Sequence, residues 1–74
     1  DLTTFLSGPS ATQLLGDLGA EIIKVEPLSG DSSRTIAGPE IDGVSAYYLA
    51  NNRNKRSIAI DLKDPRGLEL MLRL

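Results

Sequence analysis

Apolar residues near the start of the chain recur with the period of a helix. Four of them stand at positions i, i+3, i+4 and i+7, the spacing of one helical face: Ala11, Leu14, Leu15 and Leu18. Ser7 is a candidate N-cap before this stretch, and Gly19 follows it, where a left-handed residue is favoured. The pattern predicts an amphipathic helix, and residues 2–6 before it are expected to end a strand.

Two later runs have the features of strands. Residues 21–26 are short and partly β-branched, and Pro27 closes them because proline has no N–H for a sheet ladder. In residues 57–62 every second residue is isoleucine or leucine, which is expected of a strand covered on both faces. A strand end, a helix and a second strand make a βαβ unit, whose strands should be parallel.

The remaining stretches predict a loop and two helices. Residues 28–43 are rich in Gly, Ser, Asp and Pro and lack periodicity, so a long loop is expected there, followed by a short helix at residues 45–49. Asp64 and Pro65 suit the N-cap and first turn of a last helix that continues to Leu74. Alternating strands and helices predict an α/β fold with a largely parallel sheet.

Size and composition narrow the classes of function. The chain has 74 residues and lacks Cys and His, which excludes disulfides and a zinc cluster of those residues. No apolar run reaches the roughly 18 residues of a membrane span, and no signal peptide is recognisable. The chain opens without Met and stops inside the predicted last helix. We therefore expect a fragment of an intracellular protein with no membrane partner.

Charge is distributed unevenly along the chain. Residues 1–50 carry two cationic and seven anionic side chains, net −5, whereas residues 51–74 carry six and three, net +3. A basic last third in an acidic chain favours a local anion site over a surface for nucleic acid. With only three aromatic residues, the chain also has little with which to stack on bases.

Candidate anion-binding positions lie next to the predicted strands. The turn after residues 2–6 meets a helix start, which attracts anions, but neither a G-x-G-x-x-G nor a G-K-[ST] motif is present. Arg34 in the long loop either holds a carboxylate or phosphate or is solvated. The carboxylates form no recognisable acid/base constellation, so we interpret them as surface or structural groups.

Four cationic residues flank the strand at 57–62: Arg53, Lys55 and Arg56 before it and Lys63 after it. At about 3.3 Å per residue the two ends are roughly 17–20 Å apart, too far for one phosphate to touch both. Either the two groups serve different partners, or one pairs within the protein while the other meets a ligand, or all are solvated.

Three ordered blocks carry a resemblance to a known family: S-G-P-S-A-T-Q-L-L-G-D-L-G-A-E-I-I-K-V-E-P, G-D-S-S-R and N-R-N-K-R-S-I-A-I-D-L-K-D-P-R-G-L-E-L. In order and spacing they resemble the N-terminal part of the class III coenzyme A transferase family. That family includes formyl-CoA transferase, carnitine-type and succinyl-type CoA-transferases, and alpha-methylacyl-CoA racemase.

The resemblance implies a large domain with a Rossmann-like parallel sheet, helices on both faces, and coenzyme A as ligand. Residues 1–74 would be the N-terminal part of that domain only, in an interlocked homodimer. The family's contacts to coenzyme A fall on two turns: Leu6 and Ser7 after the first strand, and Ile60, Asp61, Leu62 and Lys63 at the end of the third. Lys63 is the cation among them. Pro27 stands where several members have an arginine for phosphate, and Arg53 and Arg56 are expected to pair within the protein.

The resemblance also implies a chemistry. In the transferases an aspartate attacks the acyl-CoA thioester and coenzyme A passes to a carboxylic acid through an aspartyl-CoA intermediate. That aspartate is expected beyond residue 74, so no catalytic residue and no metal ligand is assigned here. The racemase branch is the alternative, followed by a nucleotide-binding oxidoreductase and a non-catalytic nucleic-acid-binding α/β module. The expected location is cytoplasmic, or mitochondrial or peroxisomal in a eukaryote.

Overall fold

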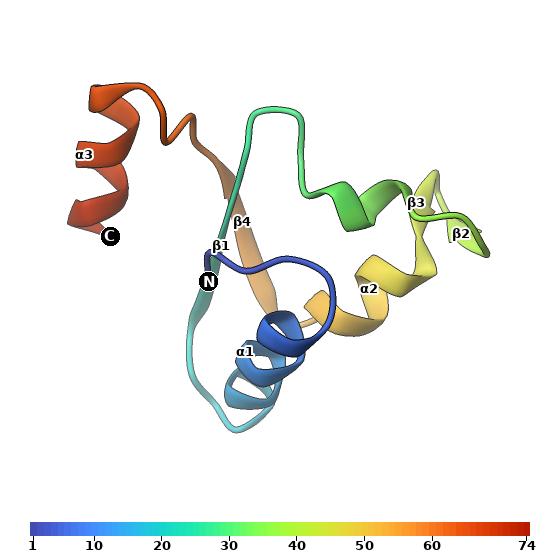
Figure 1. The fold of residues 1–74 in the computed structure, drawn as a ribbon. Coiled ribbons are helices and arrows are strands. Elements are labelled where there is room, and N and C mark those ends of the chain that lie inside the picture. Colours follow the sequence, from blue (N-terminus) through green and yellow to red (C-terminus); the bar gives the residue numbers. More distant parts are fainter.

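The computed structural model describes all residues, 1–74, as a small α/β arrangement (Figure 1). The elements in chain order are α1 (Ser7–Asp17), β1 (Ile22–Glu26), the 3-10 helix η1 (Ser32–Thr35), β2 (Glu40–Ile41), β3 (Val44–Ser45), α2 (Ala46–Asn52), β4 (Lys55–Ala59) and α3 (Pro65–Arg73). The mixed α/β class predicted from the sequence is confirmed. None of the helices has the length and apolar character needed to cross a membrane.

The parallel pair β1 and β4 is the centre of the structure. Its register runs from Ile22 opposite Lys55 to Glu26 opposite Ala59. Asp1 adds one parallel bridge on the free edge of β1, because its nitrogen donates to the Ile23 carbonyl (2.7 Å) and its carbonyl accepts from the Val25 N–H (2.8 Å). The predicted parallel sheet is therefore confirmed.

The strand expected at residues 2–6 is wrong. The Asp1 carboxylate accepts the Thr3 N–H at 2.8 Å, a local bond that competes with strand pairing. Phe5 then has a φ of 66°, which no strand residue adopts. Only Asp1 pairs with the sheet before the chain turns toward α1.

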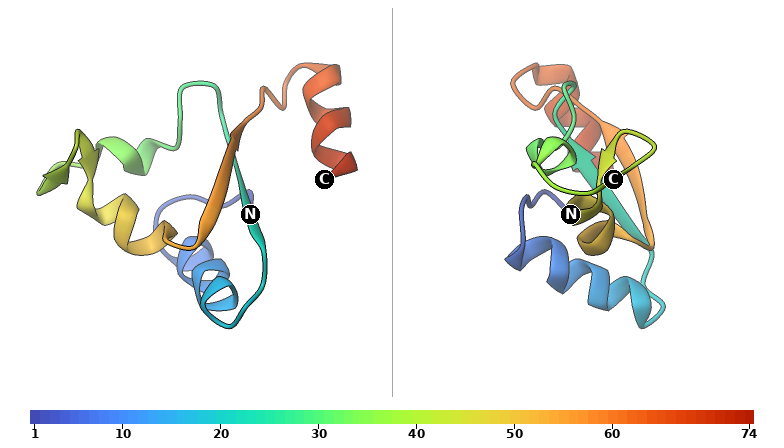
Figure 2. Two further views of the ribbon diagram at one scale, coloured as in Figure 1. Left: turned by 180° about the vertical axis from the view of Figure 1, so that it is seen from behind. Right: turned by 90° about the vertical axis from the view of Figure 1, so that its right-hand side faces the viewer.

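Helices lie on two sides of the sheet. Figures 1 and 2 show α3 on one side of the β1–β4 pair, and α2 with the β2–β3 hairpin on the other. The α3 side meets the apolar residues Ile23 and Val25, which line a shallow groove with Met71. The opposite side carries Lys24 and Glu26, since successive side chains of a strand point to opposite faces. One face of this sheet is thus apolar and the other ionic.

Polar side chains make up most of the buried interior. Only Tyr48 and Ile60 are buried hydrophobic core residues, whereas seven polar or charged residues are buried: Gln13, Lys24, Glu26, Asp31, Ser33, Ser45 and Asn52. Every buried side-chain nitrogen and oxygen has a hydrogen-bond partner. The interior satisfies the rule that buried polar groups are paired.

Helix α1 is present as predicted, but it buries its other face. Leu14 and Leu18 are 60% and 77% exposed, and the buried positions are Pro9 and Gln13. The Gln13 side-chain oxygen accepts the Arg53 N–H at 3.1 Å, which attaches α1 to the start of the β4 region. The leucine stripe of α1 therefore lies on the surface of this chain.

The ends of α1 and β4 differ from the predictions. Leu6, not Ser7, is the N-cap residue of α1 and makes no side-chain cap, whereas Gly19 has the predicted positive φ, 106°. Strand β4 begins at Lys55 and ends at Ala59, not at residues 57 and 62 as predicted. Its partner β1 ends at Glu26, before Pro27, so residues 60–62 have no strand opposite them, and only the Ile60 N–H still donates to the Glu26 carbonyl (2.9 Å). Ser57 and Ala59 are exposed, so this strand is not covered on both faces.

The long loop expected at residues 28–43 is wrong in part. It contains η1 and the first strand of the β2–β3 hairpin, in which Ile41 pairs with Val44. Asp42 and Gly43 have φ values of 52° and 79°, as a two-residue turn of type I′ requires. An Asp-Gly pair between two β-branched residues is a hairpin signal that our sequence analysis did not use. The short helix predicted next is confirmed as α2, and the last helix as α3 with Asp64 as its N-cap.

We expect residues 1–74 on their own to unfold without a sharp cooperative transition. A two-residue hydrophobic core and many exposed leucines leave little apolar burial to offset chain entropy. Thermal denaturation of the isolated chain, followed by circular dichroism, should give a broad and shallow curve. A steep melt of this peptide would contradict the expectation.

Candidate functional site

A hollow lies where the two parallel strands end. Its volume is about 510 Å³. The lining residues are Leu2, Val25, Glu26, Pro27, Leu28, Ser29, Ile60, Asp61, Leu62 and Lys63. They come from the ends of β1 and β4, from the turns that follow, and from the segment before α1; we call this site the strand-end hollow. Open parallel sheets bind ligands at this edge.

Two tight turns form opposite walls of the hollow. At residues 27–30 the Gly30 N–H donates to the Pro27 carbonyl (2.8 Å), and at residues 61–64 the Asp64 N–H donates to the Asp61 carbonyl (3.2 Å). The Asp61 carboxylate also accepts the Lys63 N–H at 3.0 Å, which fixes the second turn from within. Each strand is therefore followed at once by a defined turn.

The start of α3 supports the second turn from behind. Gly67 lies against the Asp61 backbone so closely that a Cβ at this position would collide with the Asp61 carbonyl oxygen and lie 2.9 Å from its carbon. The Asp64 side chain caps the helix through the Arg66 N–H (2.9 Å). A hydrogen bond from the Arg66 side chain lowers the pKa of this carboxyl below its ordinary value.

Lys63 is the one cationic side chain that lines the strand-end hollow. It is exposed and takes part in no ion pair. Four of the predicted site residues, from Ile60 to Lys63, line the hollow together. Leu6 and Ser7 do not line it; they begin α1, where the Leu6 carbonyl accepts the Ser10 N–H at 2.9 Å.

On the β1 side of the hollow, sequence reasoning singled out only Pro27, as the position where several family members have an arginine for phosphate. It missed the other lining residues, Leu2, Val25, Glu26, Leu28 and Ser29. A signal was available, because residues 27–30 follow a predicted parallel strand at its carboxyl end, where ligand sites of such sheets collect. Leu2 had no comparable signal, since only the return of the chain past β1 brings it there.

The Glu26 carboxylate accepts hydrogen bonds from several of the polar groups beside the hollow. Its two oxygens accept from the Asp31 N–H (2.8 Å), Arg34 Nε (2.6 Å), Arg34 Nη2 (2.8 Å), the Tyr48 hydroxyl (3.4 Å) and the Ser57 hydroxyl. The side chain is only 3% exposed. The Arg34 guanidinium, followed by Ser57 and the Asp31 N–H, outweighs the effect of burial and lowers the pKa of Glu26 to about 2.

Arg34 is not a solvated loop residue. Besides its two bonds to Glu26 it lies over the Tyr48 ring, 4.1 Å from the centroid, and donates to the Tyr48 hydroxyl at 2.8 Å. Burial and the Glu26 charge raise the pKa of Tyr48 to about 12, so the phenol stays neutral. Arg34 was expected either to hold a carboxylate or phosphate or to be solvated. It holds a carboxylate, that of Glu26 in the same chain.

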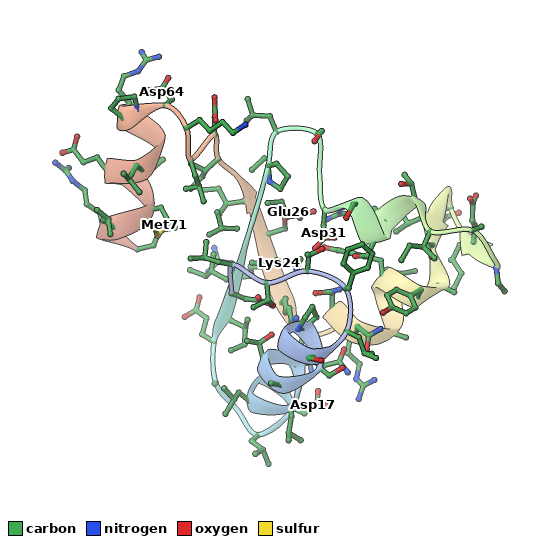
Figure 3. All side chains as sticks on the ribbon, viewed as in Figure 1. Asp17, Lys24, Glu26, Asp31, Asp64 and Met71 are labelled. Carbon is green, nitrogen blue, oxygen red and sulfur yellow. The ribbon has the colours of Figure 1, made fainter.

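A second ionic group lies next to Glu26 on the same sheet face. Lys24 Nζ is 3.0 Å from Asp31 and donates to the Thr3 carbonyl at 2.8 Å, while Lys55 Nζ is 2.8 Å from Asp1. Figure 3 shows Lys24, Glu26 and Asp31 close together between β1 and η1. Burial raises the pKa of Asp31, but hydrogen bonds from Ser33, Thr4 and Lys24 together hold it well below its usual range.

The basic side chains at residues 53–56, which lead into β4 and form its first two positions, pair within the protein. Arg53 pairs with Asp17 (3.0 Å) and Arg56 with Glu21 (2.7 Å), both at the surface, as predicted for these two arginines. The side chain of Lys55 is 2% exposed, so it is neither solvated nor free for a ligand. No group of three or more carboxylates that could hold a metal ion lies together.

The strand-end hollow is built for binding more than for catalysis. It combines apolar walls with one free cation, and its carboxylates Glu26 and Asp61 already accept hydrogen bonds from the protein. A ligand with an apolar body and an anionic group matches this lining.

Comparison with known proteins gives one consistent result. Residues 1–74 match the family described as CoA-transferase family III. The chain is 55% identical to human succinyl-CoA:glutarate CoA-transferase over 75 residues, covering 100% of the chain and 17% of that protein. It is 46% identical over 81 residues to succinate–glutarate CoA-transferase of Agrobacterium fabrum, covering 100% of the chain and 20% of that protein. The chain thus spans about a fifth of the length of these curated relatives.

Solved structures agree with the sequence comparison. A CAIB/BAIF family protein from Brucella suis superposes with a TM-score of 0.88 at 43% identity, over 97% of this chain and 20% of that one. A hypothetical protein from Mycobacterium tuberculosis has a TM-score of 0.86 at 44% identity, over 99% and 20%. The arrangement of β1, β4 and the helices is therefore shared with experimentally determined relatives.

We expect Gly67→Ala to displace the turn at residues 61–64 and to destabilise the whole protein by about 1–3 kcal/mol, because overpacking against backbone cannot be relieved by a side-chain rotation. Thermal unfolding of the variant should show the loss. Glu69→Ala, at a charged and exposed position of α3, is the control and should change stability little. Wild-type stability of Gly67→Ala would refute the close contact.

Proposed function

Because the chain belongs to CoA-transferase family III, we propose that it forms the N-terminal part of the large domain of a CoA-transferase and holds coenzyme A in the strand-end hollow. The observation that carries this proposal is the position of Lys63, an unpaired cation at the carboxyl end of a parallel strand. Nucleotide ligands of open α/β sheets collect at that edge.

The lining of the hollow suits the nucleotide end of coenzyme A. Leu28, Ile60 and Leu62 offer apolar surface to the adenine, and Lys63 offers charge to the phosphorylated ribose. The volume of about 510 Å³ falls within the usual range of ligand pockets. Pro27 provides no charge, so Lys63 carries that task within this chain. Leu6 and Ser7 would approach the pantetheine portion through their backbone at the start of α1.

The proposed reaction is transfer of coenzyme A between carboxylic acids. A carboxylate of the enzyme attacks the thioester and releases the coenzyme A thiolate, leaving a mixed anhydride. The thiolate then attacks the enzyme's acyl carbon, which releases the donor acid and forms an aspartyl-CoA thioester. The acceptor acid repeats the two steps in reverse order. We place the attacking aspartate outside residues 1–74, so this chain contributes binding and no catalytic residue.

Succinate and glutarate are the substrates we propose to test first. Two relatives, at 55% and 46% identity, are named for the exchange of coenzyme A between these dicarboxylic acids. Formyl-CoA and oxalate are the next pair, from a relative at 45% identity. An interlocked homodimer remains a prediction from the resemblance, and an intracellular location remains a prediction from the sequence.

Rival functions are less well supported by the geometry. A nucleic-acid-binding surface would need free cations, but Arg53 and Arg56 are paired and Lys55 is buried. A nucleotide-binding oxidoreductase lacks its glycine fingerprint here. Alpha-methylacyl-CoA racemase stays as the alternative, because it would use the same coenzyme A site.

We expect the whole protein to convert succinyl-CoA and glutarate into glutaryl-CoA and succinate. Chromatographic separation of the two thioesters measures the exchange directly. The control reaction contains an (R)-2-methylacyl-CoA and no acceptor acid, and its product is analysed for inversion. Inversion without any exchange would favour the racemase alternative. Absence of inversion and of exchange, with both the succinyl-CoA–glutarate and the formyl-CoA–oxalate pair, would refute the proposal.

We expect Lys63→Ala in the whole protein to raise the dissociation constant of coenzyme A about tenfold, since one exposed charge-assisted contact is lost. Isothermal titration measures the affinity, and an unchanged melting temperature shows that the fold is intact. Arg73→Ala, which removes a cation from the far end of α3, is the matched control. Equal affinities of wild type and Lys63→Ala would count against the assigned role.

A further inference from the structure

We propose that Glu26 and Arg34 act as a positioning clamp: their ion pair holds the turn at residues 27–30 in place as a wall of the strand-end hollow, so coenzyme A affinity depends on them. The inference rests on the proposed function of the hollow. It also gives a role to the G-D-S-S-R block, whose arginine does not line the hollow.

The first argument is that the clamp closes the turn at both ends. Glu26 is the last residue of β1, and its Oε1 accepts the Asp31 N–H at 2.8 Å and Arg34 Nε at 2.6 Å. The residues between, 27–30, are therefore fixed at each end to one carboxylate. Three of them, Pro27, Leu28 and Ser29, line the hollow.

The second argument is that both walls of the hollow meet at Glu26. Its carbonyl accepts the Ile60 N–H at 2.9 Å, and its carboxylate accepts from the Ser57 hydroxyl on β4. Ile60 begins the run of lining residues that ends at Lys63. One residue thus sets the separation between the turn after β1 and the turn after β4.

The third argument is that Arg34 is itself held in one orientation. The guanidinium binds the Glu26 carboxylate through two nitrogens. It also lies over the ring of Tyr48, a buried residue of α2. A planar fork in this geometry cannot be replaced by the ammonium group of lysine without losing one of the two bonds. The clamp therefore depends on arginine and not on charge alone.

A comparable ion pair between the residue before β1 and a residue of β4 makes the test specific. Glu21 and Arg56 form a 2.7 Å pair at the opposite, exposed end of the sheet. Their side chains are 67% and 78% exposed, and neither lines the hollow. Glu21→Gln removes the same charge as Glu26→Gln without touching the clamp.

The experiment is a double-mutant cycle in the whole protein, with coenzyme A binding measured by isothermal titration. We expect Glu26→Gln and Arg34→Gln each to raise the dissociation constant of coenzyme A about tenfold. The double variant should also lose about tenfold, because either single substitution already breaks the Glu26–Arg34 pair and the second has nothing further to remove. The KM for the acyl-CoA should rise in parallel while kcat changes less than about twofold. Glu21→Gln should leave both parameters near wild type.

Several outcomes separate the clamp from its rivals. Unchanged affinity of Glu26→Gln, beside a wild type that binds coenzyme A, overturns the clamp and leaves the proposed function intact. Losses that multiply to about a hundredfold in the double variant also overturn it, since the two residues would then act independently. A wild type that binds no coenzyme A refutes the proposed function itself.

A milder variant keeps the test decisive where Glu26→Gln does not fold. Arg34→Lys retains the charge at a partly exposed position and loses the two-nitrogen geometry. We expect its coenzyme A dissociation constant to rise severalfold at an almost unchanged melting temperature. Wild-type affinity of Arg34→Lys would overturn the clamp.

Discussion

Pairing of buried charges on one face of the β1–β4 sheet is the constraint on which the rest of this structure depends. Lys24 and Glu26 project from adjacent same-face positions of β1 into the interior, where an unpaired charge would be strongly destabilising. Asp31 and Arg34 supply the partners, and both come from the segment after β1. The segment after β1 must therefore fold back onto that strand. Helix α2 is placed beside it because Tyr48 contacts both Arg34 and Glu26.

The ionic face and the strand-end hollow are two results of the same arrangement. Folding back at Pro27 creates the turn at residues 27–30, which becomes a wall of the hollow. The opposite wall belongs to the turn at residues 61–64, held by the start of α3. The strand-end hollow thus lies between two turns, and a carboxylate at the edge of each turn, Glu26 or Asp61, accepts the hydrogen bond that holds it.

Much of the fold could be predicted from local patterns, and the errors have physical causes. The helices and the parallel strands were recognisable because periodicity and caps are encoded in neighbouring residues. The Asp42-Gly43 turn was equally local and was overlooked. The strand at residues 2–6 failed because a side-chain bond of Asp1 competes with sheet pairing, and β4 ended early because its partner strand stops before Pro27.

The sequence by itself determined the three α-helices, that the two main strands are parallel, and that Ile60 to Lys63 lie at a strand end. It did not determine which side chains the interior would take. Burial of Lys24, pairing of Glu26 with Arg34, and exposure of the α1 leucines depend on contacts between residues distant in the chain. Only the tertiary structure decides these, because the cost of burying a charge depends on whether a partner reaches it.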